Sequence, residues 1–362
     1  MSAEDALIEI ATSNQLLLES AKEGGAKGFL KYLKEIDKNI RERITRIETT
    51  PFTKSEENAL LKDLTEFQQE IYDQYFEELK GEFEELAIEQ AAIEAEAMTT
   101  VFPEAEEVEI SRERLFAAYR RQPLDVEGWN GDRLLSGFFK KISQDNINKV
   151  NNTIASMASR SATIDEIVRA IRGTKKANYL DGILGKTNEN VRMAVRTGYQ
   201  HVATSAKVET MKSYKRFTKG YRYRAVIDSR TTPICRGIDN ENKVYEWGKG
   251  PVPPMHIGCR SQIVAVPKND AVADEDKGKR IVNFGGEPYK VDADKSYYEI
   301  LADQPKGIRE AVLGKTKAKL FDEGGLTPKE FGRLTLNQKT FEPLTIAEMK
   351  AKRPDIFRKA GI

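Results

Sequence analysis

Hydrophobic residues in the first hundred positions of the chain recur at helical spacing. The clearest stretch begins near Lys54, and its apolar positions are separated by three or four residues, at Leu60, Leu64, Phe67, Ile71, Tyr75, Leu79, Phe83 and Leu86. Residues at this spacing lie on one face of an α-helix. The pattern predicts a long amphipathic helix that ends at Pro103, preceded by a helix that ends near Ile47, before Pro51.

These helices form a predicted N-terminal helical arm over residues 1–105. Its apolar stripe is explained either by docking on a partner or by burial within a helical hairpin, and burial is the more general explanation. A central helical block follows over residues 106–214. Thr163 and Glu166 have the spacing of a capping box, and Gly173 is a natural end for the helix that begins there.

A further helix of the central block has an apolar stripe at Val191, Val195, Val202 and Ala206. His201 lies beside this stripe. As an isolated histidine on a helix flank, it is interpreted as structural or exposed.

The pattern changes to that of strands after residue 214. Tyr221–Ile227 is rich in aromatic and β-branched residues in near-alternation, and Lys243–Trp247 and Ser261–Val266 are similar. We therefore expect a small α+β module over residues 215–267.

The last segment, residues 268–362, is predicted to begin as a polar loop that reaches Asn283 and to end in short helices, one of them Gly314–Phe321. The predicted fold is therefore mainly α with a small α+β module. It has a long N-terminal helical arm, a central helical block and a compact C-terminal α+β domain with short terminal helices.

Charge is balanced over the whole chain but not locally. The 58 Lys and Arg residues and the 57 Asp and Glu residues leave a net charge of +1, which indicates neither a nucleic acid nor a membrane partner. Between Glu77 and Glu109, however, twelve glutamates accompany a single basic residue, Lys80. Such a run is typical of a solvated face, and the alternative is an acidic surface that docks on a basic partner.

The compartment is indicated by features that are missing. The first residues, MSAEDALIEI, do not have the pattern of a secretory signal, and no segment is apolar enough to be a membrane-spanning helix. Two cysteines do not make a disulfide framework. We expect synthesis in a reducing cytoplasm and no membrane partner.

Three of the four Cys and His residues in the chain lie close together, at Cys235, His256 and Cys259. A structural zinc site takes four ligands from Cys, His or carboxylate side chains. Here His256 and Cys259 would be a close pair, Cys235 the distant ligand, and Asp228 or Asp239 the fourth. The alternative is that the cysteines are buried as small hydrophobic residues and that the histidine makes an ordinary hydrogen bond.

A catalytic role for this cluster is the less favoured interpretation. No nucleophile motif, deaminase-type His-x-Glu or HExxH helix accompanies it. The one nearby histidine cannot both bind a metal ion and act as the base. We therefore expect no enzymatic activity, and a zinc-dependent hydrolase remains an alternative.

A basic segment precedes the predicted strands. Its five cationic residues are Lys212, Lys215, Arg216, Lys219 and Arg222, and the aromatic residues interleaved with them are Tyr214, Phe217, Tyr221 and Tyr223. Basic groups neutralise phosphates and aromatic rings stack on bases, so the segment is a candidate for non-specific DNA binding. The alternative is a helix-to-strand junction with buried aromatic and solvated basic side chains.

The motif around the Cys/His cluster resembles the signature of the phage head-morphogenesis family of minor head proteins, typified by protein F of phage Mu. The matching strings are Asp228-Ser-Arg230-Thr231-Thr-Pro-Ile-Cys235 and Pro253-Pro254-Met-His256-Ile-Gly-Cys259-Arg260-Ser261, followed by an apolar strand at Ile263–Val266. The resemblance covers roughly residues 130–350. Many members have a further cysteine where this chain has Ser261, which leaves Asp228 as the more plausible fourth ligand.

The resemblance implies a non-enzymatic component of a phage virion, made in the host bacterial cytoplasm. Such a protein is incorporated during head assembly, is associated with the portal vertex and acts in assembly, DNA packaging or ejection. Its expected partners are the portal protein and, as further candidates, the major capsid or scaffold protein and phage DNA. The alternative is a DNA-binding protein that is ejected with the genome.

Overall fold

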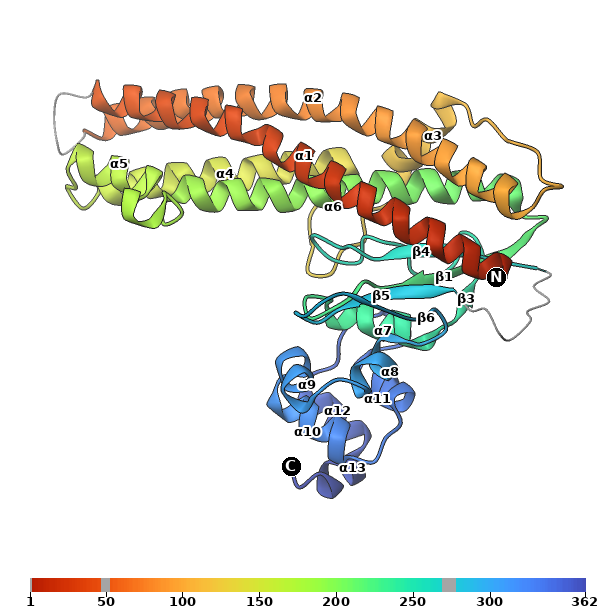
Figure 1. Ribbon diagram of the computed structural model, residues 1–362. Coiled ribbons are helices and arrows are strands. Elements are labelled where there is room, and N and C mark those ends of the chain that lie inside the picture. The colour runs from red at the N-terminus through yellow and green to blue at the C-terminus, as the bar shows by residue number, and fades with distance from the viewer. Residues whose placement is uncertain (1, 47–52, 269–277) are drawn as a thin grey trace.

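The computed structural model describes residues 2–46, 53–268 and 278–362. A long helical bundle forms one layer, two small sheets lie beneath it, and short C-terminal helices form the far end of the molecule (Figure 1). The predicted fold class, mainly α with a small α+β module, is confirmed. Ile47 and Pro51, at the predicted junction of the first two helices, lie outside the described residues. In the part of the chain that is described, no helix is long and apolar enough to cross a membrane.

The bundle contains α1 (Ala3–Thr45), α2 (Lys54–Val101), α3 (Arg112–Arg121), α4 (Leu135–Ala158), α5 (Ile164–Arg172), the short 3-10 helices η1 (Lys175–Ala177) and η2 (Lys212–Tyr214), and α6 (Ile183–Met211). As predicted, α2 begins at Lys54, and it ends just before Pro103. Thr53 and Glu56 form a capping box at its start, which satisfies backbone N–H groups that have no partner within the helix. The predicted capping box of α5 is also present, and this helix ends at Gly173.

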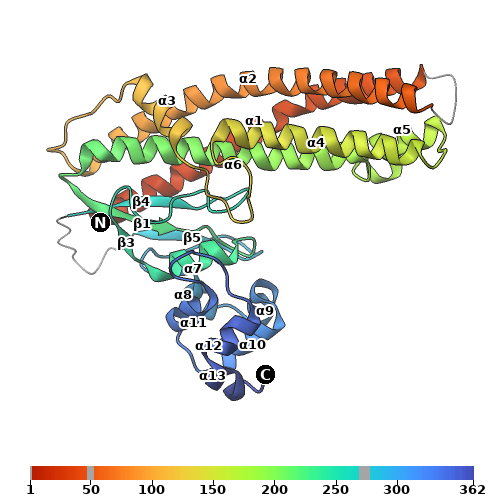
Figure 2. The ribbon, with the colours of Figure 1, turned by 180° about the vertical axis from the view of Figure 1, so that it is seen from behind.

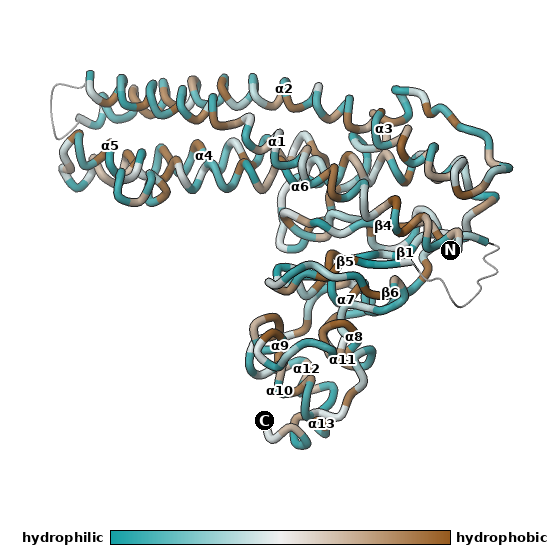
Figure 3. Tube along the Cα trace, in the orientation of Figure 1, coloured by the Kyte–Doolittle hydropathy of each residue, from teal (hydrophilic) through white to brown (hydrophobic). Residues whose placement is uncertain are grey.

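One hydrophobic core joins the bundle helices. The stripe of α2 is buried, and its aromatic residues pack against rings from α1, α4 and α6, among them Phe29, Phe139 and Tyr199. Hydrophobic and hydrophilic residues alternate along these long helices (Figure 3). Residues 1–105 and 106–214 therefore pack around the same core.

Part of the acidic run on α2 is used within the bundle. Glu78 pairs with Lys31 of α1, Glu84 with Arg120 of α3, and Glu94 with Lys207 of α6. The last of these pairs is almost completely buried, with exposed side-chain fractions of 6% and 10%. The run therefore contributes to helix packing as well as to the solvated face.

Two three-stranded sheets follow the bundle. The first has the order β3–β1–β4, with β1 (Thr218–Arg224) antiparallel to both β3 (Val244–Tyr245) and β4 (Gln262–Pro267). The second has the order β2–β5–β6, with β2 (Ile227–Asp228) parallel to β5 (Lys279–Asn283), and β5 antiparallel to β6 (Tyr289–Asp292). Each strand of the first sheet overlaps one of the three segments predicted as strands, although β1 begins three residues before its predicted segment and β4 ends one residue after its own.

Three elements here differ from the sequence expectation. The helix α7 (Pro233–Glu241), which carries Cys235, was not predicted, β5 lies within the segment predicted as a polar loop, and β6 lies where short helices were expected. In β5 the positions that face inward are Arg280 and Val282. Arg280 is buried because it pairs with the fully buried Asp239 of α7. An inward-facing arginine hides the alternation that identifies a strand.

The C-terminal end is a group of short helices: α8 (Tyr297–Ala302), α9 (Lys306–Leu313), α10 (Lys315–Glu323), α11 (Pro328–Thr335), α12 (Ile346–Lys352) and α13 (Pro354–Lys359). The helix predicted over Gly314–Phe321 is α10. These helices surround a core that also contains Ile227 of β2 and Val282 of β5. The second sheet is therefore part of the same body as the C-terminal helices.

The start of α1 joins the bundle to the first sheet. Its residues Leu7, Ile8 and Ala11 share a core with Val264 and Ala265 of β4. Figure 2 shows α1 running obliquely from the bundle down to the strands. The helix that opens the chain thus belongs to both layers.

Candidate metal centre

The helix α7 positions Cys235. Thr232 is the N-cap residue and Pro233 occupies the first turn, where a missing N–H group costs no hydrogen bond. Cys235 follows within the first turn of the helix. Ile234 and Ile238 hold the helix against Tyr221 and Tyr223 of β1 in a shared core.

A tight turn before β4 positions His256 and Cys259. The N–H group of Cys259 donates to the carbonyl of His256 over 3.2 Å. Gly258 has a φ of +71°, and a Cβ atom here would lie 2.3 Å from the methyl carbon of Met193 on α6. Only glycine fits this position without strain.

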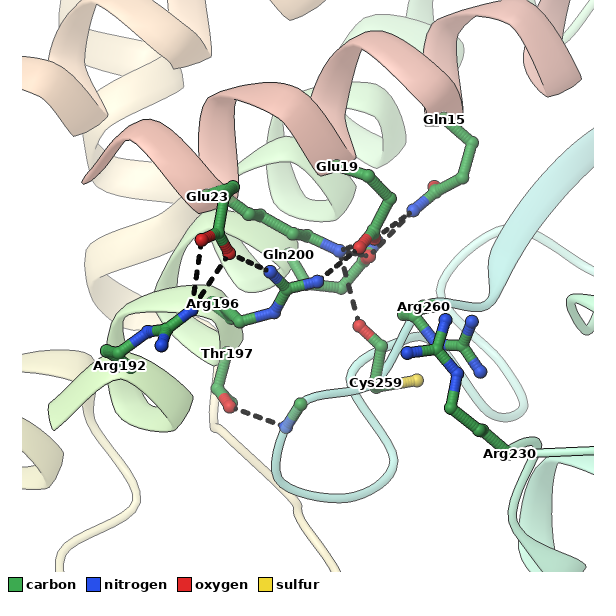
Figure 4. Close-up of polar contacts among 12 residues, drawn as sticks. Gln15, Glu19, Glu23, Arg192, Arg196, Thr197, Gln200, Arg230, Cys259 and Arg260 are labelled. Carbon is green, nitrogen blue, oxygen red and sulfur yellow. Dashed lines mark hydrogen bonds and ion pairs between the residues drawn. The ribbon is translucent and has the colours of Figure 1, made fainter. Parts of the chain in front are cut away.

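The bundle holds this turn from the other side. Thr197 of α6 accepts a hydrogen bond from the N–H group of Gly258 over 2.9 Å, and Lys22 of α1 donates to the carbonyl oxygen of Cys259 over 3.3 Å (Figure 4). Lys22 is completely buried and also bonds Glu19 and Gln200. The predicted close ligand pair is therefore fixed by the bundle, and the distant ligand by α7.

The structure brings Cys235, His256 and Cys259 together, with all ligand atoms within 4.8 Å of one another. The two sulfur atoms are 3.8 Å apart. Two sulfurs bound at about 2.3 Å to a tetrahedral zinc ion are about 3.8 Å apart as well. The three side chains fit a metal ion with this coordination.

The charge distribution also suits a cation. Burial raises the pKa of the Cys259 thiol, but hydrogen bonds from Cys235 and His256 outweigh burial and lower this pKa well below its usual value. Burial raises the pKa of Cys235, and its neighbour Cys259 raises it further. Burial lowers the pKa of His256, but its contact with Cys259 outweighs this effect and raises it. Without a metal ion, Cys259 carries the negative charge and His256 is its partner.

Tyr223 is a further residue at the centre that the sequence reasoning did not single out. Its hydroxyl group lies 3.1 Å from the sulfur of Cys235 and 3.8 Å from that of Cys259. Burial raises the pKa of this phenol well above its usual value, so the hydroxyl keeps its proton and can donate it to a sulfur atom. A strand pattern reveals that Tyr223 is buried but not what it contacts.

The expected fourth ligand, Asp228, is not part of this group. Its carboxylate accepts two hydrogen bonds from Arg260, over 2.6 and 2.9 Å, and one from Thr231 over 3.0 Å. Burial raises the pKa of Asp228, but the bonds and charge of Arg260 outweigh burial and lower it. The alternative, Asp239, is occupied by Arg280. Within the described residues the group therefore has three protein ligands.

The basic segment has little aromatic surface to offer. Tyr214, Tyr221 and Tyr223 are buried, and Phe217 stacks on Phe102 at the end of α2. Base stacking by the three tyrosines is therefore excluded in this conformation, and Phe217 is partly buried.

Four of the five cations of the segment, Lys212, Lys215, Arg216 and Lys219, are exposed. Lys212 pairs with Glu209, Arg216 bonds the carbonyl of Glu104, and Arg222 pairs with Glu4. The segment therefore keeps surface charges, some of them paired with neighbouring groups.

His201 has the structural role that is one of its two predicted interpretations. Its ring is buried, and Nε2 lies 2.8 Å from the carbonyl oxygen of Tyr119. Burial lowers its pKa to about 4. The histidine is therefore neutral near pH 7 and bonds α6 to α3.

Lys22 is a further residue that sequence reasoning missed, although its position gave a signal. It occupies the same face of α1 as Leu18 and Phe29, at helical spacing from both. A lysine within an apolar stripe indicates a buried polar contact.

No protein-family model, curated protein or solved structure matches this chain.

Proposed function

We propose that this chain is a minor head protein of a tailed bacteriophage, a non-enzymatic structural component of the virion that binds at the portal vertex and acts in head assembly, DNA packaging or ejection. One observation supports this proposal most. The residues that carry the family resemblance contact one another as a structural unit: Asp228 bonds Thr231 and Arg260, and Cys235 meets His256 and Cys259. Because the residues of the signature contact one another, a role in maintaining the fold explains why they occur together.

The exposed side of α1 is the proposed docking surface for the partner protein. The bundle exposes large apolar residues on α1, including Leu16 and Leu17, with exposed fractions of 62% and 65%. The portal protein is the proposed partner, with capsid or scaffold protein as further candidates. Exposed apolar side chains of this size are a common feature of docking surfaces.

Location in the particle tests the function. The protein should be present in purified virions and should remain with the isolated portal in high salt, because apolar contacts are insensitive to screening. Cryo-EM of the portal vertex would then show density for the bundle. Absence from virions contradicts the proposal, and transfer into the host with the DNA would favour the ejected DNA-binding alternative.

Zinc is the proposed metal ion at the Cys235, His256 and Cys259 centre, because thiolate and imidazole donors suit it. Zinc bound there would supply a cross-link between α7 and the turn before β4. Tyr223 would donate to a coordinated sulfur, and Lys22 and Thr197 would keep the turn in place. Hydrogen bonds to the residues that coordinate a metal ion, such as these, hold the ligands in the right orientation.

Metal analysis of the purified full chain tests the zinc proposal. We expect about one zinc ion per chain, lost in a Cys235→Ser variant, together with a lower unfolding temperature. A Ser159→Ala variant, changed at an exposed site after α4, should keep both the metal and the stability. A correctly folded chain without stoichiometric zinc contradicts the proposal.

A further inference from the structure

A cleft borders the metal centre. It has a volume of about 500 Å³ and lies between α6, the start of α7 and the turn before β4. Cys235 and His256 both line it, so two of the three metal ligands face the same space. The cleft therefore lies against one side of the metal centre.

The coordination of the metal centre is incomplete within the described chain. Three protein ligands are present, whereas a tetrahedral zinc ion takes four. The carboxylate expected from the sequence as the fourth ligand, Asp228, is held by Arg260. Zinc sites with three protein ligands keep the fourth position for water or another exogenous ligand.

The charges around the cleft leave room for one anion. Five cationic side chains lie at or behind its wall, against four carboxylates that pair with them: Lys22, Arg192, Arg196, Arg230 and Arg260, against Glu19, Glu23, Glu189 and Asp228. A zinc ion with two thiolates and a neutral histidine adds no net charge. Among these ion-paired groups, the surplus is therefore one positive charge.

The surplus charge lies at Arg230. Its side chain is 78% exposed and approaches Asp228 only to 3.8 Å, because Arg260 already occupies both carboxylate oxygens. Figure 4 shows the Arg230 and Arg260 guanidinium groups together beside Cys259, whereas Arg192 and Arg196 point to the glutamates of α1. Arg230 is thus the exposed arginine of the cleft whose guanidinium group makes no close ion pair.

A second group at the cleft also lacks a partner. Thr232, the N-cap residue of α7, makes no capping bond, and its hydroxyl oxygen has no hydrogen-bond partner. It lines the cleft beside Arg230. A guanidinium group, a hydroxyl group and a metal ion around one space are the groups that bind phosphate oxygens.

We propose that the fourth ligand of the zinc ion is a phosphate oxygen from outside the chain, held in the cleft by Arg230 and Thr232. This inference rests on the zinc site proposed above. The phosphate belongs either to free phosphate or to a nucleic acid, and both sources present the same oxygens.

The test uses the full chain loaded with Co²⁺ in place of zinc, because the visible absorption of cobalt reports its ligands. Thiolate-to-cobalt absorption that zinc abolishes establishes the metal site, and its absence overturns both proposals. Inorganic phosphate should then change the cobalt bands and saturate. If phosphate leaves the bands unchanged while the thiolate absorption is present, the inference fails and the zinc site stands.

Further titrations separate the ligand classes. Acetate at equal ionic strength should change the bands much less, and an equal response overturns phosphate recognition. An oligonucleotide with a 5′-phosphate and the same oligonucleotide without it distinguish the sources. A response to the first alone assigns a free or terminal phosphate, a response to both assigns the backbone, and a response to neither, with inorganic phosphate active, assigns the free ion.

A variant pair tests the role of Arg230. Arg230→Gln should raise the dissociation constant for phosphate about tenfold, because one charge-assisted hydrogen bond is lost. Arg160→Gln, an exposed arginine at the end of α4, is the matched control and should leave it unchanged. Both variants should show the parental cobalt spectrum without phosphate. An unchanged phosphate constant in Arg230→Gln contradicts the assignment.

Discussion

At the scale of single residues, the signature motif contains two distinct kinds of contact. Cys235, His256 and Cys259 come together as the sequence predicts. This contact was predictable because cysteine and histidine are scarce in the chain and share metal-binding chemistry. Asp228 was assigned to the same group and instead pairs with Arg260. An aspartate serves equally as a metal ligand or as an ion-pair partner, and only the fold determines which of the two it meets.

The ion pair between Asp228 and Arg260 gives a stability prediction. Both side chains are largely buried, and Asp228→Asn leaves the arginine without its counter-charge. We expect a loss of about 3 kcal/mol in the free energy of unfolding, measured by urea denaturation. Asp145→Asn removes an exposed pair with Lys141 and should cost less than about 0.5 kcal/mol. Equal effects of the two substitutions would contradict this assignment.

The same carboxylate predicts a pH dependence. Its pKa in the folded chain is lowered below the unfolded value, so the folded state binds fewer protons in acid. The stabilisation is therefore fully present above the unfolded pKa of about 4 and is lost as the pH falls through the folded value. The stability difference between the parent chain and Asp228→Asn should shrink over this range. A difference that stays constant between neutral pH and pH 3 would be evidence against the pair.

At the scale of elements, long helices were predictable and short elements were not. The stripe of α2 repeats over many turns, and each repeat strengthens the same prediction. By contrast, α7 is nine residues long and begins at a Thr-Pro pair, within a stretch for which the sequence predicted no particular element. The strand β5 was obscured because its inward position holds Arg280, whose partner Asp239 lies on α7. Whether α7 and β5 form a helix and a strand depends on contacts between segments that are distant in sequence.

The crossing of α1 and α6 gives a prediction with a control in the adjacent residue. A Cβ atom at Gly25 would lie 2.4 Å from the hydroxyl oxygen of Tyr199, whereas one at Gly24 would have nothing within 4 Å. Gly25→Ala should therefore destabilise the chain by about 1–3 kcal/mol through overpacking. Gly24→Ala should stabilise it by about 0.5–1 kcal/mol, because alanine favours a helix. Thermal unfolding of both variants measures the difference, and shifts of the same sign would refute the close packing.

At the scale of the whole molecule, α1 makes the bundle and the first sheet one body. The sequence predicts α1 as part of an arm, but nothing in its periodicity reveals that its first turns cover β4. The apolar residues there have the same spacing as those that face α2. The surface that an apolar stripe covers is determined by the path of the whole chain. It therefore cannot be predicted from the sequence of the helix itself.

This junction can be tested by truncating one side chain. Ile8 is 3% exposed within the core that it shares with β4, so Ile8→Ala should cost about 2–4 kcal/mol. Leu17 lies on the same helix but is 65% exposed, and Leu17→Ala should change stability by less than about 0.5 kcal/mol. Chemical denaturation would measure the stability of both variants, and hydrogen exchange would measure the protection of the backbone amides of β4. Unchanged protection of Val264 and Ala265 in Ile8→Ala would disprove the shared core.

The hairpin of α1 and α2 also has a mechanical consequence. The 48 residues of α2 span about 72 Å, and the described contacts of the hairpin with the first sheet lie in the half where α1 begins and α2 ends, with Lys22 of α1 bonding the turn before β4. A rotation of about 5° at that contact moves the far end by about 6 Å, slightly more than one helical turn of 5.4 Å. The length of the hairpin would therefore amplify any small tilt at β4, the pivot. A small tilt at the pivot is enough to shift whatever grips the far end of the hairpin by a full turn.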